Sequence, residues 1–149
     1  MNDANGTARG SVAATAVLVV AVVTLLIRHA LFGNNVASIA VQIGAGILML
    51  WARLTFGARS FHAAANPTAG GVVTTGPYRF VRHPIYAALL YFIWAGVLSH
   101  ASYLHVSLAV LATAMIAVRI AAEERLLVGR YPEYVAYAAR TKRVVPFLL

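Results

Sequence analysis

Four stretches of the chain contain no Asp, Glu, Lys or Arg and consist mainly of apolar residues. They cover residues 11–27, 36–52, 85–99 and 101–118. A helix needs roughly 20 mainly apolar residues to cross a hydrocarbon core about 30 Å thick, with about 17 as a lower limit. The first, second and fourth stretches reach that limit, and the third is shorter. The pattern predicts four membrane crossings, of which the last two form a tight helical hairpin.

Composition agrees with a membrane protein. Of the 149 residues 61% are apolar and 11% are charged, and the mean hydropathy is +0.78. Soluble domains contain about 45–50% apolar and about 25% charged residues. The chain has no Cys, which excludes a disulfide, a thiol nucleophile and a thiolate metal site. We expect one all-α domain over residues 1–149, a bundle of about four transmembrane helices followed by a cytoplasmic helical tail.

The basic residues predict the orientation in the membrane. Twelve Lys and Arg against four acids give a net charge of +8, and they separate the apolar stretches instead of forming the single basic face of a nucleic-acid-binding protein. With a cytoplasmic N-terminus, only Arg28 lies outside, as the positive-inside rule favours. No small-residue cleavage pattern follows Ile27, so the first stretch is interpreted as a retained helix rather than a signal peptide. Both termini and the polar segments at 53–84 and 119–149 are expected in the cytoplasm.

The first polar segment contains a candidate anion site. Pro84 suits the first position of a helix, because its missing N–H would be unpaired there, so His83 is expected to cap the third membrane helix. A helix N-terminus attracts anions. Arg79 and Arg82 add positive charge beside it, which indicates a pocket for a carboxylate or a phosphate. The alternative is that these side chains only anchor the helix end at the lipid headgroups.

The second polar segment places acids next to the membrane. Glu123 and Glu124 continue the fourth helix, and adjacent helical residues point about 100° apart, so only one of them can face inward at full depth. Ionisable groups near the hydrocarbon are costly and often functional. The alternative is an ion pair between Arg119 and Glu123 on the helix surface.

Three tyrosines, at positions 131, 134 and 137, recur every third residue around Pro132. They are expected on one stripe of a short helix. We favour interfacial anchoring over an aromatic wall for a ligand as the interpretation of this stripe.

Neither a dinucleotide-binding glycine motif nor a close metal-ligand spacing of the histidines is present, so no metal site is expected. Gln42 is interpreted as an interhelical hydrogen-bonding residue.

The two polar segments together resemble the integral-membrane methyltransferases related to isoprenylcysteine carboxyl methyltransferase and phospholipid N-methyltransferase. Residues 76–86, GPYRFVRHPIY, are similar to the family signature G-P-Y-x-x-V-R-H-P-x-Y. Residues 123–146, EERLLVGRYPEYVAYAARTKRVVP, are similar to its second signature of paired Glu, spaced aromatic residues, basic residues and a closing Pro. The similarity covers about residues 50–146.

The resemblance implies that the chain uses S-adenosylmethionine without a Rossmann domain. The carboxylate of that cofactor suits the candidate anion site, and its ammonium suits a Glu. By motif position, the resemblance implies a set of cofactor-binding residues, which are Gly76, Pro77, Tyr78, Arg82, His83, Tyr86, Glu123, Glu124 and Tyr134. No residue is identified as a general base, because the sulfonium already makes the methyl group reactive and the protein mainly positions it.

The expected acceptor is a lipophilic molecule from the bilayer, such as a prenylcysteine-type carboxylate, a phospholipid amine or another small lipid. Membrane lipids are expected partners and nucleic acid is not. One alternative is an NADPH-dependent sterol or lipid reductase, since such enzymes carry a similar R-H-P-x-Y stretch, but they tend to have Asn where Ile85 stands and lack the paired Glu. Another alternative is a non-catalytic membrane scaffold, which would bind neither cofactor.

Overall fold

The computed structural model describes residues 2–57 and 71–145, and their side chains from residue 10 onward. Within these ranges the regular elements are helices, and one parallel bridge joins Val81 to Lys142. The prediction of an all-α fold is therefore confirmed. In chain order the elements are α1 (Asn2–Ile27), α2 (Val36–Phe56), the 3₁₀-helix η2 (Gly76–Arg79), α3 (Pro84–Ser99), α4 (Tyr103–Arg130) and α5 (Glu133–Arg140).

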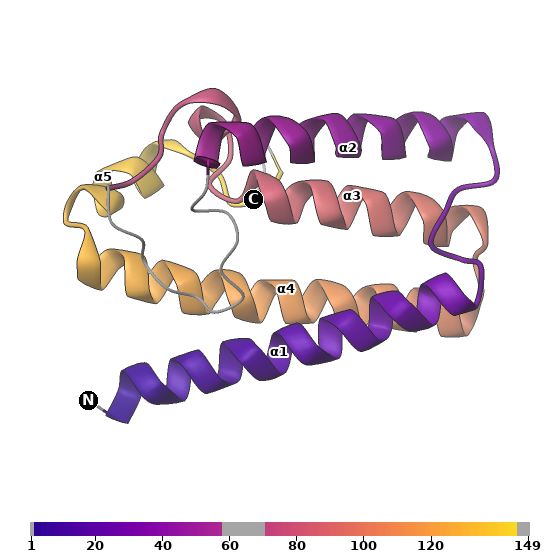
Figure 1. Cartoon of the computed structure of the whole chain (residues 1–149), viewed down its shortest axis with the longest axis horizontal. Helices are drawn as coiled ribbons and strands as arrows, with labels where there is room; N and C mark the ends of the chain where they lie inside the picture. Colours follow the sequence, from indigo (N-terminus) through magenta and orange to yellow (C-terminus); the bar gives the residue numbers. More distant parts are fainter. Residues whose placement is uncertain (1, 58–70, 146–149) are drawn as a thin grey trace.

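The four long helices run in alternating directions (Figure 1). α2 packs along α3, α1 packs along α4, and α3 packs against α4 and so joins the two pairs. The start of α1, η2 and α5 lie at one end of the bundle, and the loops at 28–35 and 100–102 lie at the other (Figure 1). Both segments that carry candidate chemistry are therefore at the same end.

Three of the helices are long and apolar enough to cross a membrane. They are α2, α4 and the part of α1 at Gly10–Ile27. α3 is also apolar but has only 16 residues, so the predicted number of four crossings is approximate. Only 17% of the apolar window of α2 is buried within the protein. Most of its large side chains therefore point outward, as expected for a helix that faces lipid.

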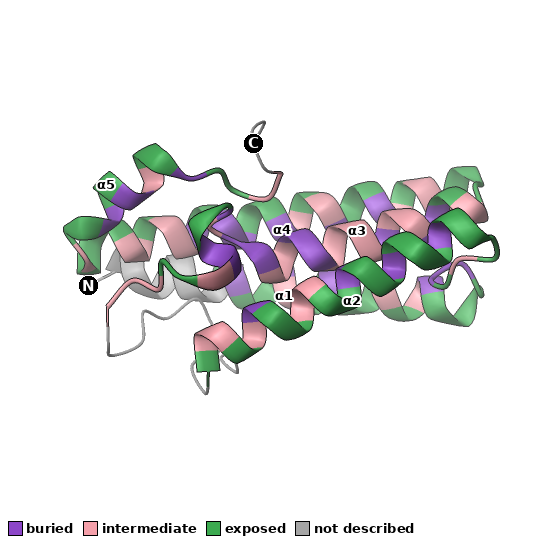
Figure 2. Cartoon of the chain, turned by 90° about the horizontal axis from the view of Figure 1, so that it is seen from above, coloured by how far each residue is buried: buried purple, intermediate pink, exposed green. Residues whose placement is uncertain are grey.

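The buried residues lie along the seams between the helices, and exposed residues cover the outer faces (Figure 2). Apolar residues from α1, α3 and α4 and from the loop after α1 form the core. Its larger members are Leu18, Leu25, Leu31, Ile93, Val97, Ile116 and Ile120.

The end of the bundle that carries the loop at 28–35 is held by the amide of Gln42. Its Nε2 donates to the carbonyl oxygens of Leu31, at 2.8 Å, and Phe92, at 3.0 Å, and its Oε1 accepts from the N–H of Gly33 at 2.9 Å. The interhelical role predicted for Gln42 is confirmed. Three of the four hydrogen-bonding positions of one amide thus tie α2 to α3 and to the loop before α2.

Proline residues begin both helices at the end that carries the candidate chemistry. Pro84 is the first residue of α3 with His83 as its N-cap, and Pro132 precedes α5, as predicted. The predicted stripe of three tyrosines is wrong at Tyr131, which ends α4 and lies before the turn into α5. Only Tyr134 and Tyr137 are on α5, because the chain changes direction at Pro132.

We expect Gly96→Ala to destabilise the bundle. A Cβ at Gly96 would overlap the carbonyl oxygen of Leu31 and lie 3.0 Å from that of Ala30, and backbone atoms cannot move aside cheaply. Overpacking of this kind costs about 1–3 kcal/mol. Gly44→Ala is the control, because a Cβ there meets no atom within 4 Å and removing a mid-helix Gly stabilises by about 0.5–1 kcal/mol. Thermal unfolding in detergent should separate the two variants, and equal melting temperatures would contradict this packing.

Candidate functional site

A short backbone pairing brings the two polar segments together. The N–H of Arg82 donates to the carbonyl oxygen of Lys142 at 2.6 Å, and the N–H of His83 donates to that of Arg143 at 2.9 Å. The first bond is part of the bridge between Val81 and Lys142, and the second follows it. The tail after α5 therefore runs beside the residues that lead into α3. The pairing also uses the backbone N–H of His83, so this donor is not available to an anion at the start of α3.

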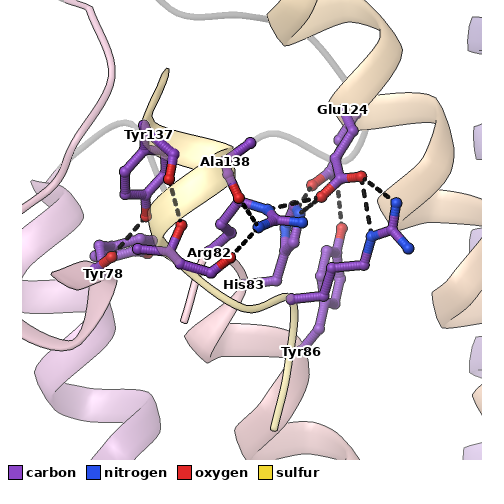
Figure 3. A network of polar contacts seen from close by, with 10 residues as sticks. Tyr78, Arg82, His83, Tyr86, Glu124, Tyr137 and Ala138 are labelled. Atoms are coloured by element: carbon purple, nitrogen blue, oxygen red, sulfur yellow. Dashed lines mark hydrogen bonds and ion pairs between the residues drawn. The ribbon is translucent and has the colours of Figure 1, made fainter. Parts of the chain in front are cut away.

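The side chain of Arg82 continues this connection inside the protein (Figure 3). Its Nε lies 3.0 Å from Oε1 of Glu124. Its Nη1 donates to the carbonyl oxygens of Ala138, at 2.8 Å, and Thr141. Arg82 thus links α3, α4 and the end of α5.

Both carboxylate oxygens of Glu124 are bonded to arginines. Arg82 binds Oε1, and Arg143 binds Oε2 through Nε, at 3.0 Å, and Nη2, at 2.9 Å. The side chain of Glu124 is 13% exposed and that of Arg82 is 10% exposed, whereas that of Arg143 is 59% exposed. The ion pair with Glu124 also raises the pKa of Arg143 further above its usual value. Both oxygens of Glu124 are therefore occupied by arginine donors, and Glu124 attaches the tail to α4.

The neighbouring acid, Glu123, has a different environment. Its Oε1 accepts hydrogen bonds from the hydroxyl of Tyr86 and from Nη2 of Arg119, the latter at 3.2 Å. Arg119 also donates from Nε to the hydroxyl of Tyr86 at 2.9 Å. Oε2 of Glu123 has no hydrogen-bond partner in the described part of the chain and lies 3.7 Å from Nδ1 of His83. One oxygen of Glu123 is thus available to a ligand.

Two buried polar atoms beside these acids also lack hydrogen bonds within the described ranges. They are Nε2 of His83 and the hydroxyl of Tyr134. Nε2 of His83 lies 3.5 Å from Oε1 of Glu124 without forming a hydrogen bond. The imidazole ring is tilted against the ring of Tyr86, with 5.8 Å between the centroids. Since buried polar atoms are normally paired, unpartnered atoms next to an accessible carboxylate fit a ligand-binding site.

The residues of η2 attach the loop to α2 and α5. Gly76 has φ 57°, a conformation that favours glycine, and a Cβ there would lie 2.6 Å from Oγ1 of Thr55. Pro77 is buried, and the ring of Tyr78 stacks on Phe56 with 5.5 Å between the centroids. The structure thus places Gly76, Pro77 and Tyr78 in packing contacts beside the cluster of charged residues.

The two tyrosines of α5 face the protein. Tyr134 is 3% and Tyr137 8% exposed, and their rings meet edge to face with 5.9 Å between the centroids. The hydroxyl of Tyr137 donates to the carbonyl oxygen of Tyr78 at 2.6 Å. Burial raises the pKa of both tyrosines, to about 12 for Tyr137. Interfacial anchoring is therefore wrong for these two residues, because their rings pack inside the protein.

The structure brings together six of the nine predicted site residues, which are Arg82, His83, Tyr86, Glu123, Glu124 and Tyr134. From the sequence, Arg119 is predicted only as a surface partner of Glu123. The structure confirms the ion pair, but Arg119 is 6% exposed and bonds to three helices. A cation directly after an apolar stretch is costly unless it is paired. The position of Arg119 after such a stretch is the sequence feature that indicates a buried, paired arginine. Its partner on α1, Thr15, had no such signal.

We expect Glu124→Gln to detach the tail and destabilise the protein. The change leaves the part-buried guanidinium of Arg82 without its carboxylate partner, and losing a hydrogen bond to a charged group costs about 1–3 kcal/mol. Thermal unfolding should show this loss, and hydrogen exchange should increase at the N–H groups of Arg82 and His83. Glu133→Gln, at an exposed position of α5, is the control. Unchanged exchange in Glu124→Gln would refute the anchoring role.

Tyr137→Phe should make stability less sensitive to alkaline pH. Folding raises the pKa of Tyr137 from 10.0 to about 12, so the folded chain holds this proton more tightly. The resulting stabilisation is complete below pH 10 and is lost as the pH rises towards 12. Below pH 10 the variant should lose about 1 kcal/mol with the hydrogen bond to Tyr78. Denaturant unfolding across this pH range tests both effects, with Tyr103→Phe, at a fully exposed position, as the control.

Comparison with known proteins identifies the family of this chain. A family model described as phospholipid methyltransferase matches residues 34–134, from the loop before α2 to the start of α5. A cobalt-zinc-cadmium resistance protein, CzcN, from Cupriavidus metallidurans is 30% identical over 140 residues, which cover 85% of this chain and 61% of the relative. The chain thus spans about three fifths of the length of that relative. No solved structure matches. The apolar helices and the family match together show that this integral membrane protein belongs to the phospholipid methyltransferase family.

Proposed function

We propose that this protein transfers a methyl group from S-adenosylmethionine to a lipophilic acceptor at the cytoplasmic surface of the membrane. The observation that carries the proposal is the accessible oxygen Oε2 of Glu123, which lies 3.7 Å from Nδ1 of His83, a ring whose buried Nε2 has no hydrogen bond in the described part of the chain. Membership of a methyltransferase family supports the reaction type.

The donors and acceptors of the site fit the amino-acid end of this cofactor. Its ammonium needs an acceptor, which Oε2 of Glu123 provides. Its carboxylate needs cationic donors. The exposed guanidinium of Arg143, which is bonded to the neighbouring Glu124, provides one. Arg82, which is predicted from the sequence to bind this carboxylate, already binds Glu124 and two backbone carbonyl oxygens. In the proposed site Arg82 therefore holds the tail in place.

The task of this chain in the reaction is binding and orientation. When bound, the cofactor supplies an electrophilic methyl group. Arg119 and Tyr86 hold Oε1 of Glu123, which orients its other oxygen towards the ligand. His83 and Tyr134 add two buried polar atoms that have no hydrogen bond in the described part of the chain and that a bound ligand would satisfy. Fixing donor and acceptor in line is the catalytic contribution that this cluster can supply.

The place of the site in the fold supports an acceptor that arrives from the bilayer. His83 and Tyr86 stand at the start of α3 and Glu123 near the end of α4, where two apolar helices meet the polar end of the bundle. A lipid with a reactive headgroup would reach this level without leaving the membrane. Prenylcysteine-type carboxylates, phospholipid amines and other small lipids all satisfy this condition. The excess of basic residues in the polar segments supports a cytoplasmic position for this end.

Calorimetric titration of the detergent-purified protein with S-adenosylhomocysteine tests the proposal. We expect saturable binding near one ligand per chain. Glu123→Gln and His83→Ala should each weaken it by about 1–3 kcal/mol, because each removes one partner of a charged hydrogen bond. Glu133→Gln should bind like the wild type.

The same preparation distinguishes the alternatives. A folded sample that does not bind S-adenosylhomocysteine, but whose melting temperature rises with NADPH, would replace the methyltransferase proposal with a reductase. A folded sample that binds neither cofactor would favour the scaffold. Binding by the wild type with unchanged affinity in both site variants would keep the activity and refute the assignment of Glu123 and His83.

A further inference from the structure

The first helix reaches the proposed site, although it lies outside the matched family region at 34–134. Thr15 of α1 accepts a hydrogen bond through Oγ1 from Nη1 of Arg119. The carbonyl oxygen of Ser11 lies 3.5 Å from the same nitrogen. Arg119 thus joins α1 to α4 one turn before Glu123.

The hydroxyl of Thr15 suits this contact. It donates its own proton to the carbonyl oxygen of Ser11 at 2.8 Å, so its oxygen lone pairs remain to accept from Arg119. A valine of the same shape could do neither. Thr24 on the same helix makes a similar bond to the carbonyl oxygen of Val20, at 2.7 Å, but that bond is exposed and far from Arg119.

Because the guanidinium group of Arg119 is rigid, its contact with Thr15 also influences the orientation of the residues that it binds at the ligand site. The guanidinium of Arg119 is planar and rigid, so a contact that fixes Nη1 also fixes the directions in which Nε and Nη2 donate. Nε donates to the hydroxyl of Tyr86 at 2.9 Å, and Nη2 donates to Oε1 of Glu123 at 3.2 Å. Because Arg119 is 6% exposed, water cannot readily replace a lost acceptor.

We propose that Thr15 is a positioning residue of the methyltransferase site, which orients Glu123 and Tyr86 through Arg119. The inference rests on the proposed function, since it assumes that Glu123 binds the cofactor. It assigns to α1 a part in the site that the family region does not contain.

The test compares three variants of the full chain in detergent, each by melting temperature and by titration with S-adenosylhomocysteine. Thr15→Val keeps the volume and removes the hydroxyl, and it should weaken binding about three- to tenfold. Thr15→Ser keeps the hydroxyl and removes a methyl group, and it should bind like the wild type. Thr24→Val, the matched control, should also bind like the wild type. If Thr15→Val does not fold, Thr15→Ala takes its place.

The pattern of affinities separates positioning from packing. If Thr15 only fills space, Thr15→Ser should be impaired and Thr15→Val unchanged, which would overturn the inference. Equal binding in all variants would also overturn it, while binding by the wild type would leave the proposed function standing. If the folded wild type does not bind S-adenosylhomocysteine, the proposed function fails and the inference fails with it.

Discussion

The arrangement of the polar end depends on the carboxylate of Glu124. Arg82 binds one oxygen from the residues before α3, and Arg143 binds the other from the tail, while Glu124 itself is near the end of α4. Three segments that are distant in the sequence thus meet at one acid. A buried ion pair stabilises a fold only when its remaining polar atoms are also bonded. The carbonyl oxygens of Ala138 and Thr141 satisfy that condition for Arg82.

Two adjacent acids therefore have different tasks. Their side chains leave α4 about 100° apart, so Glu124 faces the tail and Glu123 faces Tyr86 and Arg119. The first is saturated with arginine donors and holds the end of the bundle together. The second keeps one oxygen accessible, which is the property that a ligand-binding carboxylate needs. The pair combines a structural anchor and a candidate binding group within one turn of helix.

Local pattern was sufficient to predict most of the fold. Apolar runs marked the long helices, and the prolines marked the starts of α3 and α5, because each depends only on neighbouring residues. The site needed contacts between distant segments. The bridge of Val81 with Lys142 is a single backbone pairing without a strand pattern. The burial of Tyr134 and Tyr137 depends on where α5 docks, which their spacing does not encode. The contact of Thr15 with Arg119 follows only once α1 is known to pack on α4.

The pairing of the tail with the residues before α3 has a consequence for biosynthesis. A ribosome makes this chain from its N-terminus, so every long helix has been synthesised before Lys142 and Arg143 exist. Helix insertion can therefore proceed while Glu124 still lacks one of its arginines and the backbone of His83 lacks its partner. The polar end is completed last, because its backbone pairing and one of the two arginines that bind Glu124 come from the tail.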